Sequence, residues 1–178
     1  MNLMTGKRRI ANRIASKTYQ CGFSVIGKKI YFWGKCPNSN RVGYCHILRV
    51  FDCENNTFRA LCRMPIRGNW NHFEMTALNG LLFVSGGRRP LSSDPISNTF
   101  KYSPSTNMWT EVKEMNEGRR CHKMVTLNGL IYAIGGFNNQ TVECYNPTTN
   151  EWKYVAPFGF FMQSFSVISY HNRIYCLD

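Results

Sequence analysis

The sequence lacks any long apolar run. No stretch of its 178 residues approaches the roughly 18 consecutive apolar residues that a membrane-spanning helix needs. The first residues also lack the continuous apolar segment of a secretory signal. We therefore expect a soluble, cytoplasmic protein with no membrane partner.

The common catalytic signatures are missing as well. There is no glycine-rich phosphate loop leading into a helix, no H-E-x-x-H pattern and no G-x-S-x-G motif. Two of the four histidines, His72 and His122, lie at nearly matching places just before predicted strands, and this repetition favours a structural role. The sequence predicts no enzyme activity and no cofactor.

None of the eight cysteines belongs to a C-x-x-C pair. Because no export signal is visible, a disulfide framework is not expected. We interpret Cys121, Cys144 and Cys176 as small apolar strand residues that stay reduced.

A zinc site can be considered at Cys36, Cys45, His46 and Cys53, which fall within one predicted loop and strand. Their spacing matches no common structural zinc pattern, in which ligands come in close pairs. The sequence therefore predicts no metal.

Acidic residues are absent from residues 1–35, which contain eight lysines and arginines. The rest of the chain has 14 basic and 10 acidic residues, so most of the formal charge of +12 is N-terminal. The basic lead-in, residues 1–19, can be a tail that touches nucleic acid, an import signal, a mitochondrial presequence, or the remnant of a linker or preceding repeat. The remaining charge is spread along the chain, so we do not expect a nucleic-acid-binding face.

What the sequence does contain is a repeat, clearest in residues 120–155. Lys123–Leu127 and Leu130–Ile134 are short runs of aliphatic and β-branched residues on either side of Asn128-Gly129. This dipeptide suits a two-residue hairpin turn, because both central positions need a positive φ. The pattern predicts an antiparallel hairpin.

A second hairpin follows in the same repeat. Gly135-Gly136 ends the second strand, at a place where a Cβ would block a tight change of direction. Val142–Tyr145 and Glu151–Val155 flank the polar turn Asn146–Asn150. Together the two hairpins predict a four-stranded antiparallel sheet.

The same elements recur at a fixed period. Gly86 precedes Gly135 by 49 residues, and Trp109 precedes Trp152 by 43 residues. Gly34 holds the equivalent place in the first unit. The residues that we interpret as structural are Gly34, Gly86, Gly87, Gly135, Gly136, Tyr102, Tyr145, Trp109 and Trp152.

A period near 50 residues with a double glycine and a strand tryptophan resembles the kelch repeat. Lys35 and Phe58 depart from the pattern in the first unit, where they replace the second glycine and the tryptophan. The resemblance implies an all-β fold, a partial kelch β-propeller with three four-stranded blades and the first hairpin of a fourth. The kelch-repeat region spans residues 20–178, with blades at about 20–64, 71–115, 120–156 and, in part, 162–178.

Kelch propellers close as rings, most often of six blades, and each blade buries its faces against its neighbours. Three and a half blades would leave two sheet faces uncovered. We therefore expect a fragment of a longer product, a partner-dependent piece, or a truncated product without function.

Arginines and large aromatics between the predicted strands are candidates for protein contacts. Arginine can bind a carboxylate with two hydrogen bonds, and an exposed ring buries much area at little entropic cost. The predicted binding residues are Arg41, Tyr44, Arg67, Asn69, Trp70, Arg88, Arg89, Arg119, Arg120, Asn138, Phe160 and Phe161.

The second and third units look similar to the kelch domains of BTB-kelch proteins. That resemblance implies a non-enzymatic module that recognises a protein substrate for a cullin-RING ubiquitin ligase. In the family, BTB and BACK domains engage the ligase, and residues 1–19 are too short to be either. An actin-binding kelch protein remains an alternative.

A more remote alternative is a kelch-type copper radical oxidase, whose site uses tyrosines, histidines and a tyrosine–cysteine crosslink. Tyr102, Tyr145 and Cys144 supply these residue types, but the two tyrosines occupy strand positions shared by all kelch repeats. We therefore expect a binding module instead.

Overall fold

The computed structural model is an all-β protein, which confirms the predicted fold class. It contains no helix among the residues that it describes, and therefore none long and apolar enough to cross a membrane. The described residues are 22–34, 47–66, 70–89, 92–157, 159 and 165–177.

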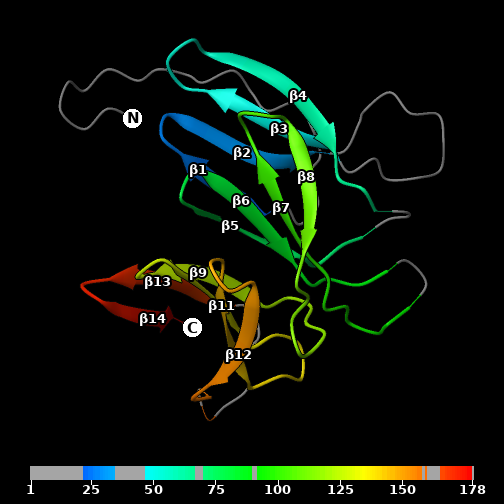
Figure 1. The fold of residues 1–178 in the computed structure, drawn as a ribbon, viewed down its shortest axis with the longest axis vertical. Coiled ribbons are helices and arrows are strands. Elements are labelled where there is room, and N and C mark those ends of the chain that lie inside the picture. The colour runs from blue at the N-terminus through cyan, green and yellow to red at the C-terminus, as the bar shows by residue number, and fades with distance from the viewer. Residues whose placement is uncertain are drawn as a thin grey trace.

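Fourteen strands are formed by the described residues (Figure 1). They are β1 (Phe23–Ile26), β2 (Lys29–Gly34), β3 (Ile47–Asp52), β4 (Thr57–Arg63), β5 (Glu74–Leu78), β6 (Leu81–Ser85), β7 (Thr99–Ser103), β8 (Met108–Val112), β9 (Lys123–Leu127), β10 (Leu130–Ile134), β11 (Val142–Asn146), β12 (Glu151–Val155), β13 (Ser166–Tyr170) and β14 (Arg173–Leu177).

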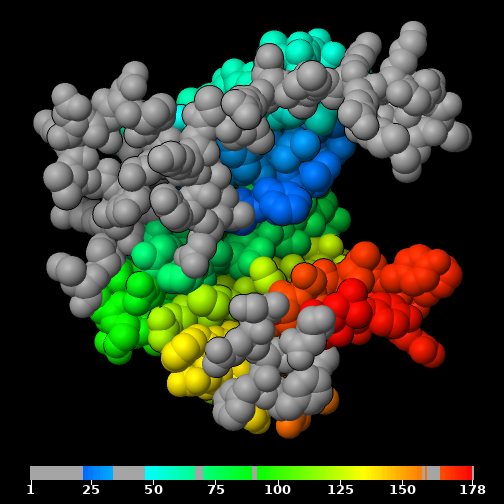
Figure 2. Space-filling model, turned by 180° about the vertical axis from the view of Figure 1, so that it is seen from behind, coloured from blue at the N-terminus to red at the C-terminus, as the bar shows by residue number. Residues whose placement is uncertain are grey.

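These strands form three four-stranded antiparallel sheets, β1–β4, β5–β8 and β9–β12, and the separate hairpin β13–β14. The first strands β1, β5, β9 and β13 contact one another in series, so they lie innermost, and β4, β8 and β12 lie outermost. Figure 2 shows the sheets following one another in chain order, with the β13–β14 hairpin (red) at one end. This arrangement is the predicted partial propeller.

The innermost hairpins turn through residues with positive φ. In the second sheet Asn79 and Gly80 have φ of 50° and 75°, and in the third Asn128 and Gly129 have 52° and 75°. The last hairpin turns in the same left-handed region without glycine, through His171 and Asn172. Asparagine tolerates this region because its short polar side chain can satisfy the backbone locally.

The double glycine sits where chain segments come closest. Gly87, at φ 99°, is so close to the segment entering its own sheet that a Cβ would lie 2.7 Å from the carbonyl oxygen of Asn71. Gly136, at φ 125°, would bring a Cβ within 2.9 Å of the carbonyl oxygen of Arg120. Both the backbone angle and the contact therefore require glycine.

The core lies between successive sheets. Tyr102 is fully buried in the cluster between the first two sheets, and Tyr145 is buried in the cluster between the second and third. Trp109 stacks on Trp33 of the first sheet, with 5.6 Å between ring centroids. Phe58, which replaces the tryptophan in the first unit, is 40% exposed and packs on its own sheet instead.

Apolar side chains are exposed on the first and last sheets of the series. Phe23 and Val25 of β1 are 69% and 52% exposed. In the last hairpin, Ile168 and Leu177 are 54% and 59% exposed. The equivalents of Ile168 and Leu177 in the third sheet, Val125 and Ile134, are instead covered by residues of β13 and β14.

Candidate functional site

Antiparallel pairing brings two sets of loops to the same edge of the sheets. In each complete sheet the first strand begins, the second ends, the third begins and the fourth ends at one edge. We call this edge the loop face. Its described parts are residues 64–66, 70–73, 86–89, 92–98, 113–122 and 135–141.

Half of the predicted contact residues can be placed on the loop face. Six are described there: Trp70, Arg88, Arg89, Arg119, Arg120 and Asn138. The other six lie outside the described residues: Arg41, Tyr44, Arg67, Asn69, Phe160 and Phe161.

Arg119 is not available to a partner, so its prediction as a contact residue is wrong. Its side chain is 1% exposed and forms an ion pair with Glu143, which is also fully buried, at 2.9 Å. The same guanidinium donates to the carbonyl oxygens of Gly135 at 3.1 Å and Thr141 at 2.7 Å. Arg119 therefore fastens the loop that enters β9 to the loop between β10 and β11.

Glu143 extends these contacts into a hydrogen-bond network, which we call the Arg119–Glu143 network. One of its carboxylate oxygens accepts hydrogen bonds from the backbone N–H and the side-chain amide of Asn116, both at 2.7 Å. The other accepts from the backbone N–H of Glu117 at 3.1 Å. Because the charged groups of Arg119 and Glu143 all have hydrogen-bond or ion-pair partners, the Arg119–Glu143 network holds two loops of the loop face rigidly.

Trp70 is also inside the protein, which corrects its prediction as an exposed anchor. It is 6% exposed, and its ring packs edge-on against Phe100 at 5.9 Å. It occupies the repeat position of Arg119, so in both sheets this position packs inward.

The accessible groups in the described part of the loop face include three arginines and one aromatic ring. Arg89 is exposed, whereas Arg88 is half-buried and donates from Nε to Oδ1 of Asn71 at 3.0 Å. The guanidinium of Arg120 lies over the ring of Phe137, 3.9 Å from its centroid, and that ring is 44% exposed. None of these arginines forms an ion pair with a described residue.

Asn138, the remaining predicted residue, is exposed beside Phe137 and has a φ of 53°. It occupies the tip of the tight turn between β10 and β11. Its neighbour Asn139 belongs to the Arg119–Glu143 network, because its Oδ1 accepts a hydrogen bond from Arg119 at 3.2 Å. Asn138 is thus the more accessible of the two amides.

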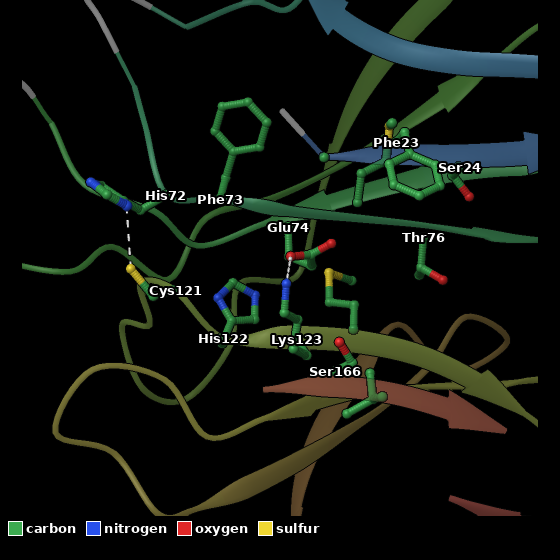
Figure 3. Close-up of a pocket in the computed structure, with 14 residues that line it drawn as sticks. Phe23, Ser24, His72, Phe73, Glu74, Thr76, Cys121, His122, Lys123 and Ser166 are labelled. Carbon is green, nitrogen blue, oxygen red and sulfur yellow. Dashed lines mark hydrogen bonds and ion pairs between the residues drawn. The ribbon is translucent and has the colours of Figure 1, made fainter. Parts of the chain in front are cut away.

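A pocket of about 590 Å³ opens where the innermost strands begin. It is lined by the first residues of β1, β5, β9 and β13 and by the segments that enter β5 and β9 (Figure 3). An ion pair between Glu74 and Lys123, 3.4 Å apart, crosses it from β5 to β9. Burial raises the pKa of Glu74, and the Lys123 ammonium partly opposes that rise.

Sequence reasoning missed a side-chain pair at the rim of this pocket. Cys121 Sγ lies 3.2 Å from Nδ1 of His72, on the neighbouring entry segment (Figure 3). The interpretation of Cys121 as a small apolar strand residue is wrong, because it precedes β9, is exposed and has a φ of 57°. Cys144 and Cys176 do lie half-buried in strands β11 and β14.

The two histidines differ by one repeat position. Gly87 approaches Phe73 in the second sheet, and Gly136 approaches His122 in the third, so His122 is the equivalent of Phe73. His72 is correspondingly the equivalent of Cys121. His122 is 1% exposed with Nε2 bonded to Ser85 at 3.1 Å, and burial lowers its pKa to about 3. It is therefore an uncharged core residue.

Metal ligands do not gather in the described part of the chain, where no three His, Cys, Asp or Glu side chains could hold one ion. The hydroxyls of Tyr102 and Tyr145 donate to Asn107 and Asn150 at 2.8 Å, in the turns at the edge opposite the loop face. These tyrosines therefore do not meet His72 at a common site. Of the proposed zinc ligands only Cys53 is described, and it is exposed.

Comparison with known proteins agrees with this architecture. A family model for the kelch motif matches residues 70–116 and 118–159, half of the chain. The chain belongs to the kelch-repeat family, and its propeller sheets form a protein-interaction module.

Two curated relatives and one solved structure illustrate the likeness. Kelch-like protein 6 of Homo sapiens is 33% identical over 112 residues, 61% of this chain and 17% of the relative. Kelch domain-containing protein 7A of Mus musculus is 28% identical over 130 residues, 73% of this chain and 16% of the relative. The solved "Structure of YjhT" superposes with a TM-score of 0.75 at 16% identity, over 90% of this chain and 57% of that one, which shows a shared fold. The chain thus spans about a sixth of the length of the two curated relatives.

Proposed function

We propose that the loop face binds an acidic segment of a protein substrate, and that the chain is the substrate-recognition part of a cullin-RING ubiquitin ligase adaptor. The observation that carries the binding step is the group of Arg88, Arg89 and Arg120, which lack ion-pair partners among the described residues. The ligase step rests on the likeness to kelch-like proteins.

The loop face is suited to binding because it is held in place before a partner arrives. The Arg119–Glu143 network fixes two loops. Backbone hydrogen bonds between Asn71 and Arg88, at 2.9 and 3.2 Å, also fix the segment that enters β5 against the segment that follows β6. A preorganised surface loses little conformational entropy on binding, so more of the contact energy appears as affinity.

Charge favours an acidic partner. Arginine presents a planar fork that matches a carboxylate, and three such groups lie on one edge of the protein. Arg120 and the exposed ring of Phe137 form a combined cationic and apolar contact. This combination fits a peptide in which Asp or Glu stands next to an apolar residue.

Selection from a random peptide display library would test the binding step. Peptides enriched on the wild-type protein should carry Asp or Glu, and Arg120→Glu should weaken their binding by at least about tenfold. Lys153→Glu is the matched control, since Lys153 makes the same charge change on the outer strand β12, where its side chain is 76% exposed. Equal binding by both variants would contradict a role for the loop face.

The ligase step needs a separate measurement. Immunoprecipitation of the protein from its natural source at native expression should recover a cullin. If peptide binding is intact and no cullin is recovered, the adaptor role is wrong and the binding role stands.

A further inference from the structure

The pair at the pocket rim suggests chemistry that goes beyond peptide binding. We propose that His72 activates the Cys121 thiol, making Cys121 a covalent modification site for soft carbon electrophiles such as α,β-unsaturated carbonyl compounds. The proposal stands on the 3.2 Å contact between Cys121 Sγ and His72 Nδ1 and on the exposure of the sulfur.

The backbone holds the two residues together. The N–H of Cys121 donates to the carbonyl oxygen of His72 at 3.0 Å, although the residues are 49 positions apart. Both adopt positive φ, 57° and 59°, which aims their side chains toward one another across the gap between two entry segments. A thiol and a base held in contact in this way form the nucleophile–base arrangement of covalent chemistry.

His72 is in the protonation state that a base needs. Burial and the nearby guanidiniums of Arg88 and Arg120 lower the pKa of His72, so at neutral pH its imidazole is uncharged and can accept the thiol proton. An exposed thiol held beside an uncharged imidazole is the arrangement found at reactive cysteines.

The neighbouring pocket offers room for the electrophile. His72 and Cys121 both line it, together with the apolar side chains of Phe23 and Met124. The ion pair between Glu74 and Lys123 supplies polar groups to the same wall. The pocket wall thus combines apolar contact with a few polar groups, as expected for a site that holds a small organic molecule.

The reaction is an addition without oxidation or reduction. His72 Nδ1 takes the thiol proton as Cys121 Sγ forms a bond to the β-carbon of the unsaturated carbonyl compound. The π electrons move onto the carbonyl oxygen as an enolate, and the α-carbon then receives the proton back from His72. The product is a thioether, and no other reactant is consumed.

Timed labelling of the full chain with N-ethylmaleimide, read by peptide mass spectrometry, tests the proposal at each cysteine. Cys121 should be labelled at least about tenfold faster than Cys53, an exposed cysteine that has no histidine contact among the described residues. His72→Asn should lower the Cys121 rate about tenfold and leave the Cys53 rate unchanged, because asparagine tolerates the positive φ but is no base.

Two controls keep the experiment decisive. In urea the Cys121 and Cys53 rates should converge to within about threefold, since the pairing depends on the fold. If His72→Asn unfolds the protein, the half-buried Cys144 becomes labelled, and His72→Gly, which also tolerates a positive φ and removes the base, then serves as the second variant, with a several-fold slower Cys121. Equal native rates at Cys121 and Cys53, or a Cys121 rate unchanged in a folded His72→Asn protein, would overturn the proposal.

Discussion

The indole N–H of Trp152 donates a 2.9 Å hydrogen bond to the backbone carbonyl oxygen of Lys113, which belongs to the preceding sheet. One repeat earlier, Trp109 makes the same bond to the carbonyl oxygen of Cys62 at 3.2 Å. Lys113 directly follows β8 and Cys62 lies in β4, so each bond joins a sheet to the outermost strand of its predecessor or to the residue just after it. The tryptophans therefore fix the angle between sheets as well as filling the gap between them.

Substitution of Asn150 should destabilise the contact between the second and third sheets. Its Oδ1 accepts from the Tyr145 hydroxyl at 2.8 Å and from the Lys113 N–H at 3.0 Å, and its φ is 56°. Asn150→Gly keeps the backbone angle and loses both bonds, so its free energy of unfolding should fall by about 2 kcal/mol. Asn150→Ala should lose about 1 kcal/mol more through strain at positive φ. Urea unfolding of both variants measures the difference, and an alanine variant as stable as the glycine variant would argue against the strain.

Gly86 and Gly80 separate backbone strain from steric contact. Gly80 has a φ of 75° and open space around it, so Gly80→Ala should cost about 1 kcal/mol. At Gly86, with φ 64°, a Cβ would also lie 2.6 Å from Cε1 of His122 and would collide with the Arg119 carbonyl oxygen. Gly86→Ala should therefore cost more than about 3 kcal/mol in urea unfolding. Similar losses in the free energy of unfolding for the two substitutions would show that the segment that enters β9 moves aside at little energetic cost.

Much of the fold follows from local signals. The Asn128-Gly129 turn and the glycine pair Gly135-Gly136 have backbone requirements that only a few residues meet, so their spacing reveals hairpins directly. Tyr145 lies in the core, and the residues on either side of it in β11, Cys144 and Asn146, are only half-buried, as strand alternation predicts. These features need no knowledge of distant partners.

The site could be predicted only in part, because its key contacts join distant residues. An arginine between strands usually faces solvent, and only Glu143, 24 positions away, makes burial of Arg119 favourable. The pairing of Cys121 with His72 likewise depends on how two sheets sit side by side. The repeat pattern does not reveal it either, because the nearly matching histidine of the next repeat, His122, is the equivalent of Phe73 and not of His72.

Breaking the buried Arg119–Glu143 pair should destabilise the protein strongly. Arg119→Met leaves the fully buried Glu143 carboxylate without its cation, so the free energy of unfolding should fall by about 3–5 kcal/mol. Arg119→Lys keeps the charge but loses the planar fork, and should fall between this variant and wild type. Equilibrium urea unfolding at pH 7 measures both. A methionine variant within about 1 kcal/mol of wild type would mean that the Glu143 carboxylate becomes hydrated or protonated at little cost.

His122 should make the protein sensitive to acid. Burial, with help from the Arg119 and Lys123 cations, lowers its pKa from the usual 6.5 to about 3. Below pH 6.5 His122 is protonated in the unfolded chain but remains uncharged in the folded protein, so the free energy of unfolding decreases as pH falls. The loss is about 1.4 kcal/mol per pH unit and continues until the folded protein also takes up the proton near pH 3.

His122→Phe isolates this effect from other titrating groups. The equivalent positions in neighbouring sheets are Phe73 and Phe165, so a phenyl ring suits the space, and the variant should be within about 1 kcal/mol of wild type above pH 7. Between pH 6.5 and 4.5 the variant should gain about 2–3 kcal/mol on wild type, as urea unfolding at each pH would show. Parallel pH profiles for the two proteins would mean that His122 becomes protonated within the folded state, through an opening of the β9 entry segment.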